Sequence, residues 1–129
     1  KLDWTEPGRD THRSLLEWHT ALIALRRATP ALLDGDLGAV DVRVGDDDWL
    51  VVRRPPLIIV CNPGPSTQRI ALDEAARSHV VQRWAKTLEF DDRSIVLSPR
   101  SVAILSVQAS GSEPVEARIL RSRTQEGTS

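Results

Sequence analysis

The chain has 129 residues, enough for one small domain plus an appended element but too few for an eight-stranded α/β barrel of roughly 200 residues or more. Its net charge of −1 and its pI of about 6.3 exclude the strong field expected of a protein that binds nucleic acid or an anionic membrane surface. With 27% charged and 40% hydrophobic residues, the chain is expected to fold as a globular protein.

Cysteine and methionine usage adds two expectations about the setting of the chain. Cys61 is the single cysteine, so no intrachain disulfide can form, and a reducing compartment is favoured. No apolar run approaches the ~18 residues of a membrane span, and no signal peptide is recognised. Because the sequence contains no methionine, Lys1 is not expected to be the native start, and the chain is interpreted as a piece of a longer protein.

The first regular element is expected to be a long helix after an irregular segment at 1–9. Asp10 or Thr11 can cap its start, and the apolar periodicity continues to about Ala28. Pro30 then ends the helix, because proline cannot continue the hydrogen-bond pattern.

The apolar face of this helix is unusually wide. It covers an arc of roughly 180°, compared with the ~100° stripe of an ordinary surface helix. Its first stripe contains Leu15, Trp18, Leu22 and Leu25. A second line beside this stripe contains Leu16 and Ile23. A helix with so wide a face usually has a neighbour on each side, and this chain supplies only one of them, the domain that follows.

Two polar residues, His19 and Arg26, fall within the apolar arc. A buried arginine is costly unless it is paired, so Arg26 is expected to form a structural ion pair or to reach the boundary between helix and domain. A ligand-binding role for either residue is disfavoured, because no second partner stands at metal-ligand or catalytic spacing.

From Gly35 onward the apolar period changes to two. Val40, Val42 and Val44 alternate with polar residues and predict a half-buried strand. Further strands are expected at 49–53, 57–61, 68–72, 78–82, 95–97 and 101–107, with 84–93 as a loop. The strand at 57–61 is apolar throughout and is expected to be central, after the Pro55-Pro56 break.

Seven short strands separated by turns predict a mainly β protein, an antiparallel β-sandwich preceded by one long amphipathic helix. The expected organisation is a terminal segment with the helix at 1–34, the sandwich at 35–108 and a flexible tail at 109–129.

Neither a catalytic nor a metal site is expected within the chain. The carboxylate groups at 73–74 and 91–92 stand in polar turns, where such pairs are usually solvated. The acids at 46–48 lack the alternate spacing, the glycine and the distant glutamate of a calcium loop. The three histidines have no ligand spacing with Cys61, which is expected to be an inert thiol in an apolar strand. No catalytic residue, metal or cofactor is therefore assigned.

Sugar binding is the sharper alternative, because exposed aromatic rings can stack on pyranose faces. The rings available are Trp4, Trp18, Trp49, Trp84 and Phe90. Trp18 and Trp49 are expected to be buried, since core packing is the usual role of tryptophan. Of the rest, Trp84 and Trp4 are the candidate sugar-contacting residues.

The order of these parts resembles the C-terminal region of the α-amylase family of glycoside hydrolases. Two segments resemble the end of that family's catalytic barrel: Lys1-Leu2-Asp3-Trp4, and the run from Leu22 to Arg27 with Pro30-Ala31-Leu32. Three segments resemble its C-terminal β-domain: Trp49–Arg53, Cys61-Asn62-Pro63 and Leu97–Leu105. The opening residues and the Leu-Arg-Arg step are most similar to the malto-oligosyltrehalose trehalohydrolases, and the resemblance covers about residues 1–107.

That resemblance implies a non-catalytic domain that stabilises the catalytic barrel of a longer, cytoplasmic hydrolase. The longer enzyme would cut the α-1,4 bond of a maltooligosyl trehalose and release trehalose, using two carboxyl groups about 5 Å apart. None of the matched positions is one of those groups. The alternatives are a glycogen branching or debranching enzyme, an α-glucan-binding module, or a free-standing interaction domain. His19 departs from the relatives, which often have an aromatic residue near this position.

Overall fold

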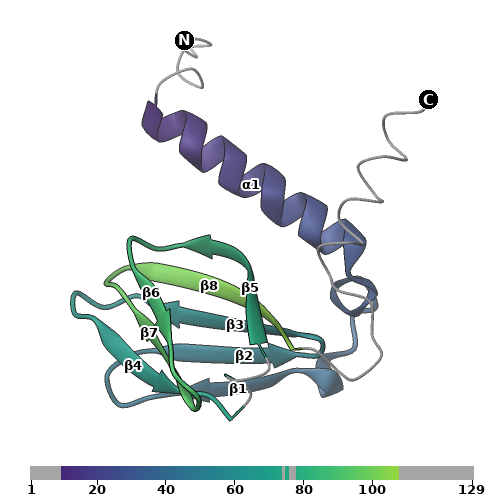
Figure 1. Ribbon diagram of the computed structural model, residues 1–129. Helices are drawn as coiled ribbons and strands as arrows, with labels where there is room; N and C mark the ends of the chain where they lie inside the picture. The colour runs from purple at the N-terminus through teal and green to yellow at the C-terminus, as the bar shows by residue number, and fades with distance from the viewer. Residues whose placement is uncertain (1–9, 74, 76–77, 108–129) are drawn as a thin grey trace.

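The computed structural model describes residues 10–73, 75 and 78–107, and Figure 1 shows a two-layer β-sandwich with one helix across its upper side. The long helix α1 (Asp10–Ala28) is followed by the short 3-10 helices η2 (Pro30–Leu32) and η3 (Leu37–Ala39). The strands are β1 (Asp41–Val44), β2 (Leu50–Arg54), β3 (Leu57–Asn62), β4 (Gln68–Ala71), β5 (Ser78–Trp84), β6 (Leu88–Phe90), β7 (Ser94–Leu97) and β8 (Ser101–Val107). The mainly β, antiparallel class is therefore confirmed.

The strands divide into two antiparallel sheets. One contains five strands in the order β1-β2-β3-β8-β5, and the other contains three in the order β4-β7-β6. The chain passes from one sheet to the other after β3, β4, β5 and β7. At these four points the connecting segment crosses between the two layers of the sandwich. As the apolar run at 57–61 predicted, β3 is central, paired with β2 on one side and β8 on the other.

The helix begins at Asp10 and ends at Ala28, in agreement with the prediction. Asp10 lies in its first turn and Arg26 and Arg27 in its last, where each charge complements the helix dipole. Thr29 follows in an extended conformation, and Pro30 starts the next short helix. The segment at 29–40, which joins α1 to β1, is called the linker below.

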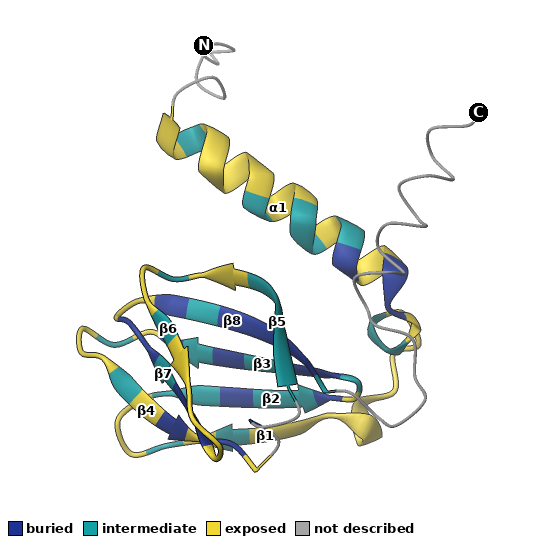
Figure 2. Cartoon of the chain, viewed as in Figure 1, coloured by how far each residue is buried: buried dark blue, intermediate teal, exposed yellow. Residues whose placement is uncertain are grey.

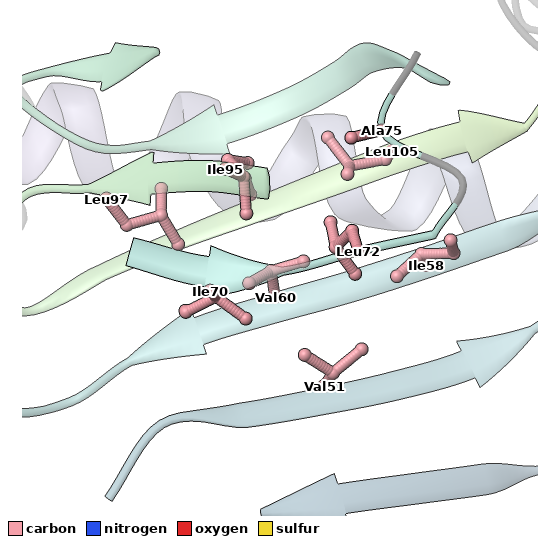
Figure 3. Packing of buried hydrophobic residues seen from close by; sticks show 10 residues of the cluster. Val51, Ile58, Val60, Ile70, Leu72, Ala75, Ile95, Leu97 and Leu105 are labelled. Atoms are coloured by element: carbon pink, nitrogen blue, oxygen red, sulfur yellow. The ribbon is translucent and has the colours of Figure 1, made fainter. Parts of the chain in front are cut away.

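The main core lies between the two sheets. Its buried members are Val51, Ile58, Val60, Ile70, Leu72, Ala75, Ile95, Leu97, Ala103 and Leu105, and Figure 3 shows the side chains of the two sheets pointing toward one another. Strands β3, β7 and β8 each contribute two alternate residues, because successive side chains of a strand point to opposite faces of the sheet.

A second, smaller cluster holds α1 against the outer face of the five-stranded sheet. Leu25 and Ala28 of the helix pack with Leu57 and Ile104 of the sheet, and Trp18 borders them. The contact is confined to one side and mostly to the C-terminal half of the helix, as the change from yellow to teal and blue in Figure 2 shows. The first stripe of the amphipathic helix is thus partly covered by its own chain.

Two features of the strand prediction are wrong. The segment at 84–93 is not simply a loop, since β5 continues to Trp84 and β6 occupies Leu88–Phe90. No clear apolar alternation marks this segment, because β6 has only three residues and two of them are exposed. Its position is set by pairing with β7, in which Phe90 stands opposite Ile95.

The inward orientation expected for the valines of β1 is also wrong. Val42 and Val44 are 56% and 66% exposed, and Arg43 is the residue that faces the core side, opposite Val51. Its guanidinium lies 5.2 Å from the ring centroid of Trp49 and donates to the carbonyl oxygen of Ala71. The alternation was read correctly, but the register with β2 assigns the valines to the outer face.

Several expectations fall outside the described residues. These are the irregular segment at 1–9 with Trp4, and the flexible tail at 109–129.

Candidate functional site

Several acidic side chains of the described residues lie in ion pairs or exposed turns. Asp91 is paired with Arg69 and accepts a hydrogen bond from Ser94. The acids at 46–48 are exposed in the β1–β2 turn. No group of three or more potential metal ligands occurs in this part of the chain, and none of its helices is long and apolar enough to cross a membrane.

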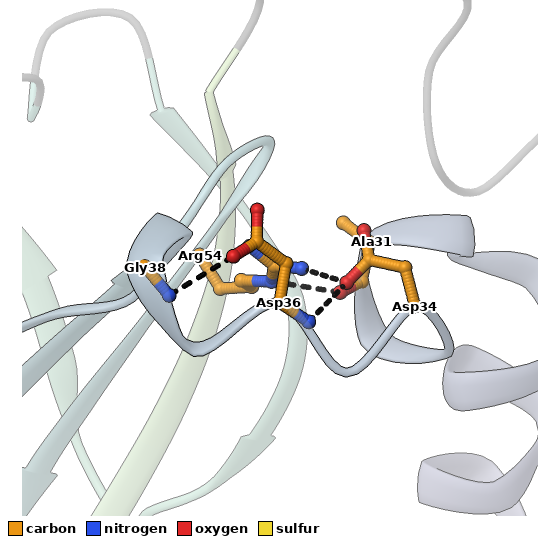
Figure 4. Close-up of polar contacts among 5 residues, drawn as sticks. All are labelled: Ala31, Asp34, Asp36, Gly38 and Arg54. Atoms are coloured by element: carbon orange, nitrogen blue, oxygen red, sulfur yellow. Dashed lines mark hydrogen bonds and ion pairs between the residues drawn. The ribbon is translucent and has the colours of Figure 1, made fainter.

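The buried cation between helix and sheet is Arg54, at the end of β2. It is 7% exposed. Its Nε donates to the carbonyl oxygen of Ala31 at 2.7 Å, and its Nη2 donates to the carboxylate of Asp34. The same carboxylate accepts from the backbone N–H of Asp36 at 2.9 Å, as Figure 4 shows. Arg54 thereby attaches the linker to the five-stranded sheet.

This role had been expected of Arg26, and that expectation is wrong. Arg26 is exposed, as is His19, whose Nδ1 lies 2.8 Å from the carbonyl oxygen of Leu15 within the helix. Helical periodicity shows which residues share a face, but it does not show how much of that face the neighbouring sheet covers.

An apolar surface remains open on the outer face of the five-stranded sheet. Because residues paired across strands project to the same side, the registers define two rows of side chains. One row contains Val44, Leu50, Cys61 and Val102 and ends at Trp84 of β5. The other contains Val42 and Val52 and continues to Ile59 and Ile104, which pack with α1. We define the open apolar face as the exposed or half-buried residues that are not in the cluster with α1: Val42, Val44, Leu50, Val52, Cys61 and Val102.

Helix α1 adds exposed apolar residues of its own. Leu16 and Ile23, the second line of the amphipathic pattern, are 55% and 54% exposed, and Leu15 is 45% exposed. Trp18 and Leu22 of the first stripe instead pack toward the sheet. The second side of the wide helical face therefore has no neighbour within the described residues.

Cys61 lies in the middle of the open apolar face and is half-buried. Burial raises the pKa of its thiol, because desolvation disfavours the thiolate. A protonated thiol is a weak nucleophile. The raised pKa is therefore consistent with the unreactive thiol that the sequence predicts for Cys61.

Trp84 stands at the edge of a cleft where β5 ends. The cleft has a volume of about 600 Å³ and is lined by Arg83, Trp84, Ala85, Lys86, Pro99, Arg100 and Ser101. Trp84 is 40% exposed, and its ring centroid lies 5.9 Å from that of Trp18, with the planes inclined by 50°. Arg83 and Lys86 flank Trp84 in the sequence, whereas Arg100 is brought to the cleft by the turn between β7 and β8.

The other rings behave mostly as expected. Trp18 and Trp49 are half-buried and pack on the two hydrophobic clusters. Phe90 is 39% exposed, on the three-stranded sheet. Trp4 lies outside the described residues, so only Trp84 of the two candidate sugar-contacting residues has a described environment.

Comparison with known proteins gives consistent results. No protein-family model matches the chain. It is 35% identical over 106 residues to a malto-oligosyltrehalose trehalohydrolase of Brevibacterium helvolum, covering 81% of this chain and 18% of that protein. A trehalohydrolase of Rhizobium sp. (strain M-11) is 34% identical over 108 residues, covering 81% and 17%. One of Arthrobacter ramosus is 40% identical over 65 residues, covering 50% and 11%.

The resemblance inferred from the sequence is therefore confirmed: the chain is similar to part of the malto-oligosyltrehalose trehalohydrolases. It spans less than a fifth of the length of the curated relatives from Brevibacterium and Rhizobium.

Proposed function

We propose that this chain is the non-catalytic C-terminal region of a glycoside hydrolase and that it stabilises the catalytic barrel of the same polypeptide. The longer enzyme would hydrolyse the α-1,4 bond of a maltooligosyl trehalose and release trehalose. The proposal is supported by similarity to trehalohydrolases over 81% of the chain, which corresponds to 17–18% of those proteins. Cytoplasmic location and the choice of trehalohydrolase over a branching or debranching enzyme belong to the same proposal.

The observation that carries the stabilising role is the open apolar face. A solvent-exposed apolar surface that includes a whole row of a sheet is typical of an interface. Val44, at 66% exposure, lies at one end of that row, and Leu16 and Ile23 add exposed apolar area on α1. A second domain packed on these residues would bury them and gain roughly 25 cal/mol for each Å² of apolar surface removed from water.

The absence of catalytic geometry in the described residues also supports a non-catalytic role. Retaining glycosidases need two carboxyl groups about 5 Å apart on either side of the scissile bond. The cleft beside Trp84 has no carboxylate in its lining. Asp34, Asp41 and Asp91 each pair with an arginine, which favours a structural role for these groups.

The test uses the long enzyme that contains this sequence. Val44→Lys places a charge on the open apolar face and is expected to lower the melting temperature of the long enzyme, while leaving that of the 129-residue chain nearly unchanged. The matched control is Glu89→Lys, at an exposed strand position of the other sheet. Equal melting temperatures for the long enzyme with either substitution would contradict docking at this face.

Trehalose release tests the catalytic half of the proposal. The long enzyme is expected to release trehalose from maltooligosyl trehalose, and the 129-residue chain is expected to release none above a blank. Activity of the short chain alone would overturn the non-catalytic assignment. Activity of the long enzyme on branched glucans in place of maltooligosyl trehalose would favour the branching or debranching alternative.

A further inference from the structure

The cleft beside Trp84 lies at the end of β5 and is lined by one exposed ring and by three residues that carry a cationic side chain. Arg83 and Lys86 come from the end of β5 and the segment after it, and Arg100 comes from the turn between β7 and β8. We propose that this cleft binds a phosphate ester carried on a ring, such as a sugar phosphate or a nucleotide, with the ring on the indole of Trp84 and the phosphate among the cations.

The polar chemistry of the cleft selects an acceptor-rich ligand. Guanidinium and ammonium groups are hydrogen-bond donors only. The hydroxyl of Ser101 is engaged with Ser98 and with the carbonyl oxygen of Pro99. No acidic or amide side chain lines the cleft, so its side chains offer few acceptors to the hydroxyl protons of a neutral sugar. A phosphate has acceptor oxygens and a negative charge, and guanidinium groups bind it in a bidentate manner.

The three cations are not neutralised by the part of the protein that the structure describes. Elsewhere in that part, Arg53, Arg54 and Arg69 form ion pairs with aspartates. No such pair involves the cations of the cleft. Like charges held near one another repel, and an anion bound between them relieves that repulsion. The arrangement therefore favours an anion over a neutral ligand.

The cleft also shows signs of fixed geometry. Arg100 has a φ of 52°, a left-handed conformation that is uncommon for residues other than glycine and asparagine and is often found at functional positions. Its backbone N–H donates to the carbonyl oxygen of Gly64 at 3.1 Å, which holds the turn. Trp18 of α1 packs at an inclined angle against Trp84 and restrains the indole that would stack on the ligand ring.

This inference goes beyond the proposed function and does not depend on it. The test is isothermal titration calorimetry of the 129-residue chain with glucose 6-phosphate, adenosine monophosphate, inorganic phosphate, glucose and a maltooligosaccharide. At least one of the two phosphate esters is expected to bind about tenfold or more tightly than phosphate or glucose, and its affinity is expected to fall as salt concentration rises. The two esters distinguish a sugar source from a nucleotide source.

Substitutions locate the site. Lys86→Gln and Arg83→Gln are each expected to weaken binding of the ester about tenfold, the order of magnitude of a hydrogen bond to a charged partner. Trp84→Leu should reduce the advantage of the ester over inorganic phosphate. Arg93→Gln removes the same charge at an exposed position outside the cleft and should leave binding unchanged. Lys86 is exposed, so its variant remains informative if Trp84→Leu does not fold.

Several outcomes would overturn the proposal. Equal affinity for inorganic phosphate and both esters would indicate an adventitious ion only. Tighter binding of the maltooligosaccharide than of either ester would assign the cleft to neutral glucans. Loss of binding in Arg93→Gln to the same extent as in Lys86→Gln would indicate a general charge effect. None of these results bears on trehalose release, so this proposal and the proposed function can fail separately.

Discussion

Arg54 and Asp34 form an ion pair that connects β2 to the linker between α1 and the sheet. The guanidinium is nearly inaccessible to solvent, with a side-chain exposure of 8%, whereas the aspartate side chain is 54% exposed. The neighbouring Arg53 forms a second pair with Asp41, in which Nη1 and Oδ2 are 3.8 Å apart. The Asp41 side chain is 72% exposed. Both arginines thus form an ion pair with an aspartate, but the pair of Arg54 is more deeply buried than the pair of Arg53.

The first prediction compares these two pairs. Asp34→Ala leaves a buried guanidinium without its carboxylate and should lower the free energy of unfolding by about 2 kcal/mol. Asp41→Ala removes an aspartate that is 72% exposed from a pair with a long N–O distance of 3.8 Å, and should cost about 0.5 kcal/mol or less. Urea unfolding followed by circular dichroism measures both. Equal costs would contradict the view that Arg54 anchors the linker.

The second prediction concerns the turn between β1 and β2. A Cβ atom added at Gly45 would lie only 2.0 Å from the indole of Trp49, a ring packed on the main core. Gly45→Ala must displace this indole and should cost about 1–3 kcal/mol. Gly64→Ala is the control, because its nearest contact would be an ordinary 3.5 Å. Thermal unfolding of both variants gives the comparison, and a harmless Gly45→Ala would mean that Trp49 moves freely.

The third prediction concerns Asn62, a fully buried amide at the end of β3. Its Nδ2 lies 2.8, 3.1 and 3.0 Å from the carbonyl oxygens of Ser66, Leu97 and Ser98, so its two N–H groups are shared among these three acceptors. It therefore connects the five-stranded sheet to the end of β7 in the other sheet. Asn62→Ala leaves these carbonyl groups without the amide donor and should cost about 3 kcal/mol, more than a single hydrogen bond.

The control for this position is Gln68→Ala in β4, since the Gln68 amide is half-buried and does not belong to the Asn62 network. Chemical unfolding should separate the two variants clearly. If both cost the same, Asn62 contributes only packing, and the connection between the sheets lies in the apolar core.

The fourth prediction uses Cys61 as a reporter of the proposed docking. The thiol is half-buried in the open apolar face, and its pKa is raised by desolvation. At neutral pH it should therefore react with a maleimide more slowly than a free thiol. In the long enzyme, a domain packed on this face should slow the reaction further. Mass spectrometry of the Cys61 peptide measures labelling in both proteins, and equal rates would contradict docking there.

The fifth prediction is a pH dependence at Asp91. A hydrogen bond from Ser94, followed by the backbone N–H of Arg93 and the charge of Arg69, lowers the pKa of this carboxyl group. A folded-state pKa below the unfolded value means that the contribution of Asp91 to stability is present above the unfolded pKa and is lost as pH falls through the folded value.

Titration of the Asp91 carboxyl by NMR should show this lowered pKa. Ser94→Ala removes the largest cause and should move the pKa upward toward the ordinary value of an aspartate. An Asp91 pKa that does not respond to Ser94→Ala would contradict this assignment.

Much of the fold could be predicted from local pattern. The helix at 10–28, the central position of β3 and the antiparallel mainly β class follow from apolar periodicity and from breakers such as Pro30 and Pro55-Pro56. The three residues of β6 are too few to show a period, so only their pairing with β7 identifies them. Trp84 was a candidate for an exposed indole, but the cleft was not expected, because the β7–β8 turn brings Arg100 to it.

The sequence by itself determined which residues alternate and which share a helical face, because these periods are properties of the local backbone. Only the tertiary structure decided which side is covered. Val42 and Val44 point outward because β1 pairs with β2 in the register that sets Arg43 opposite Val51. Arg54, rather than Arg26, is buried because the linker folds over the end of β2. Burial depends on a remote segment arriving at a surface, and no local pattern contains that information.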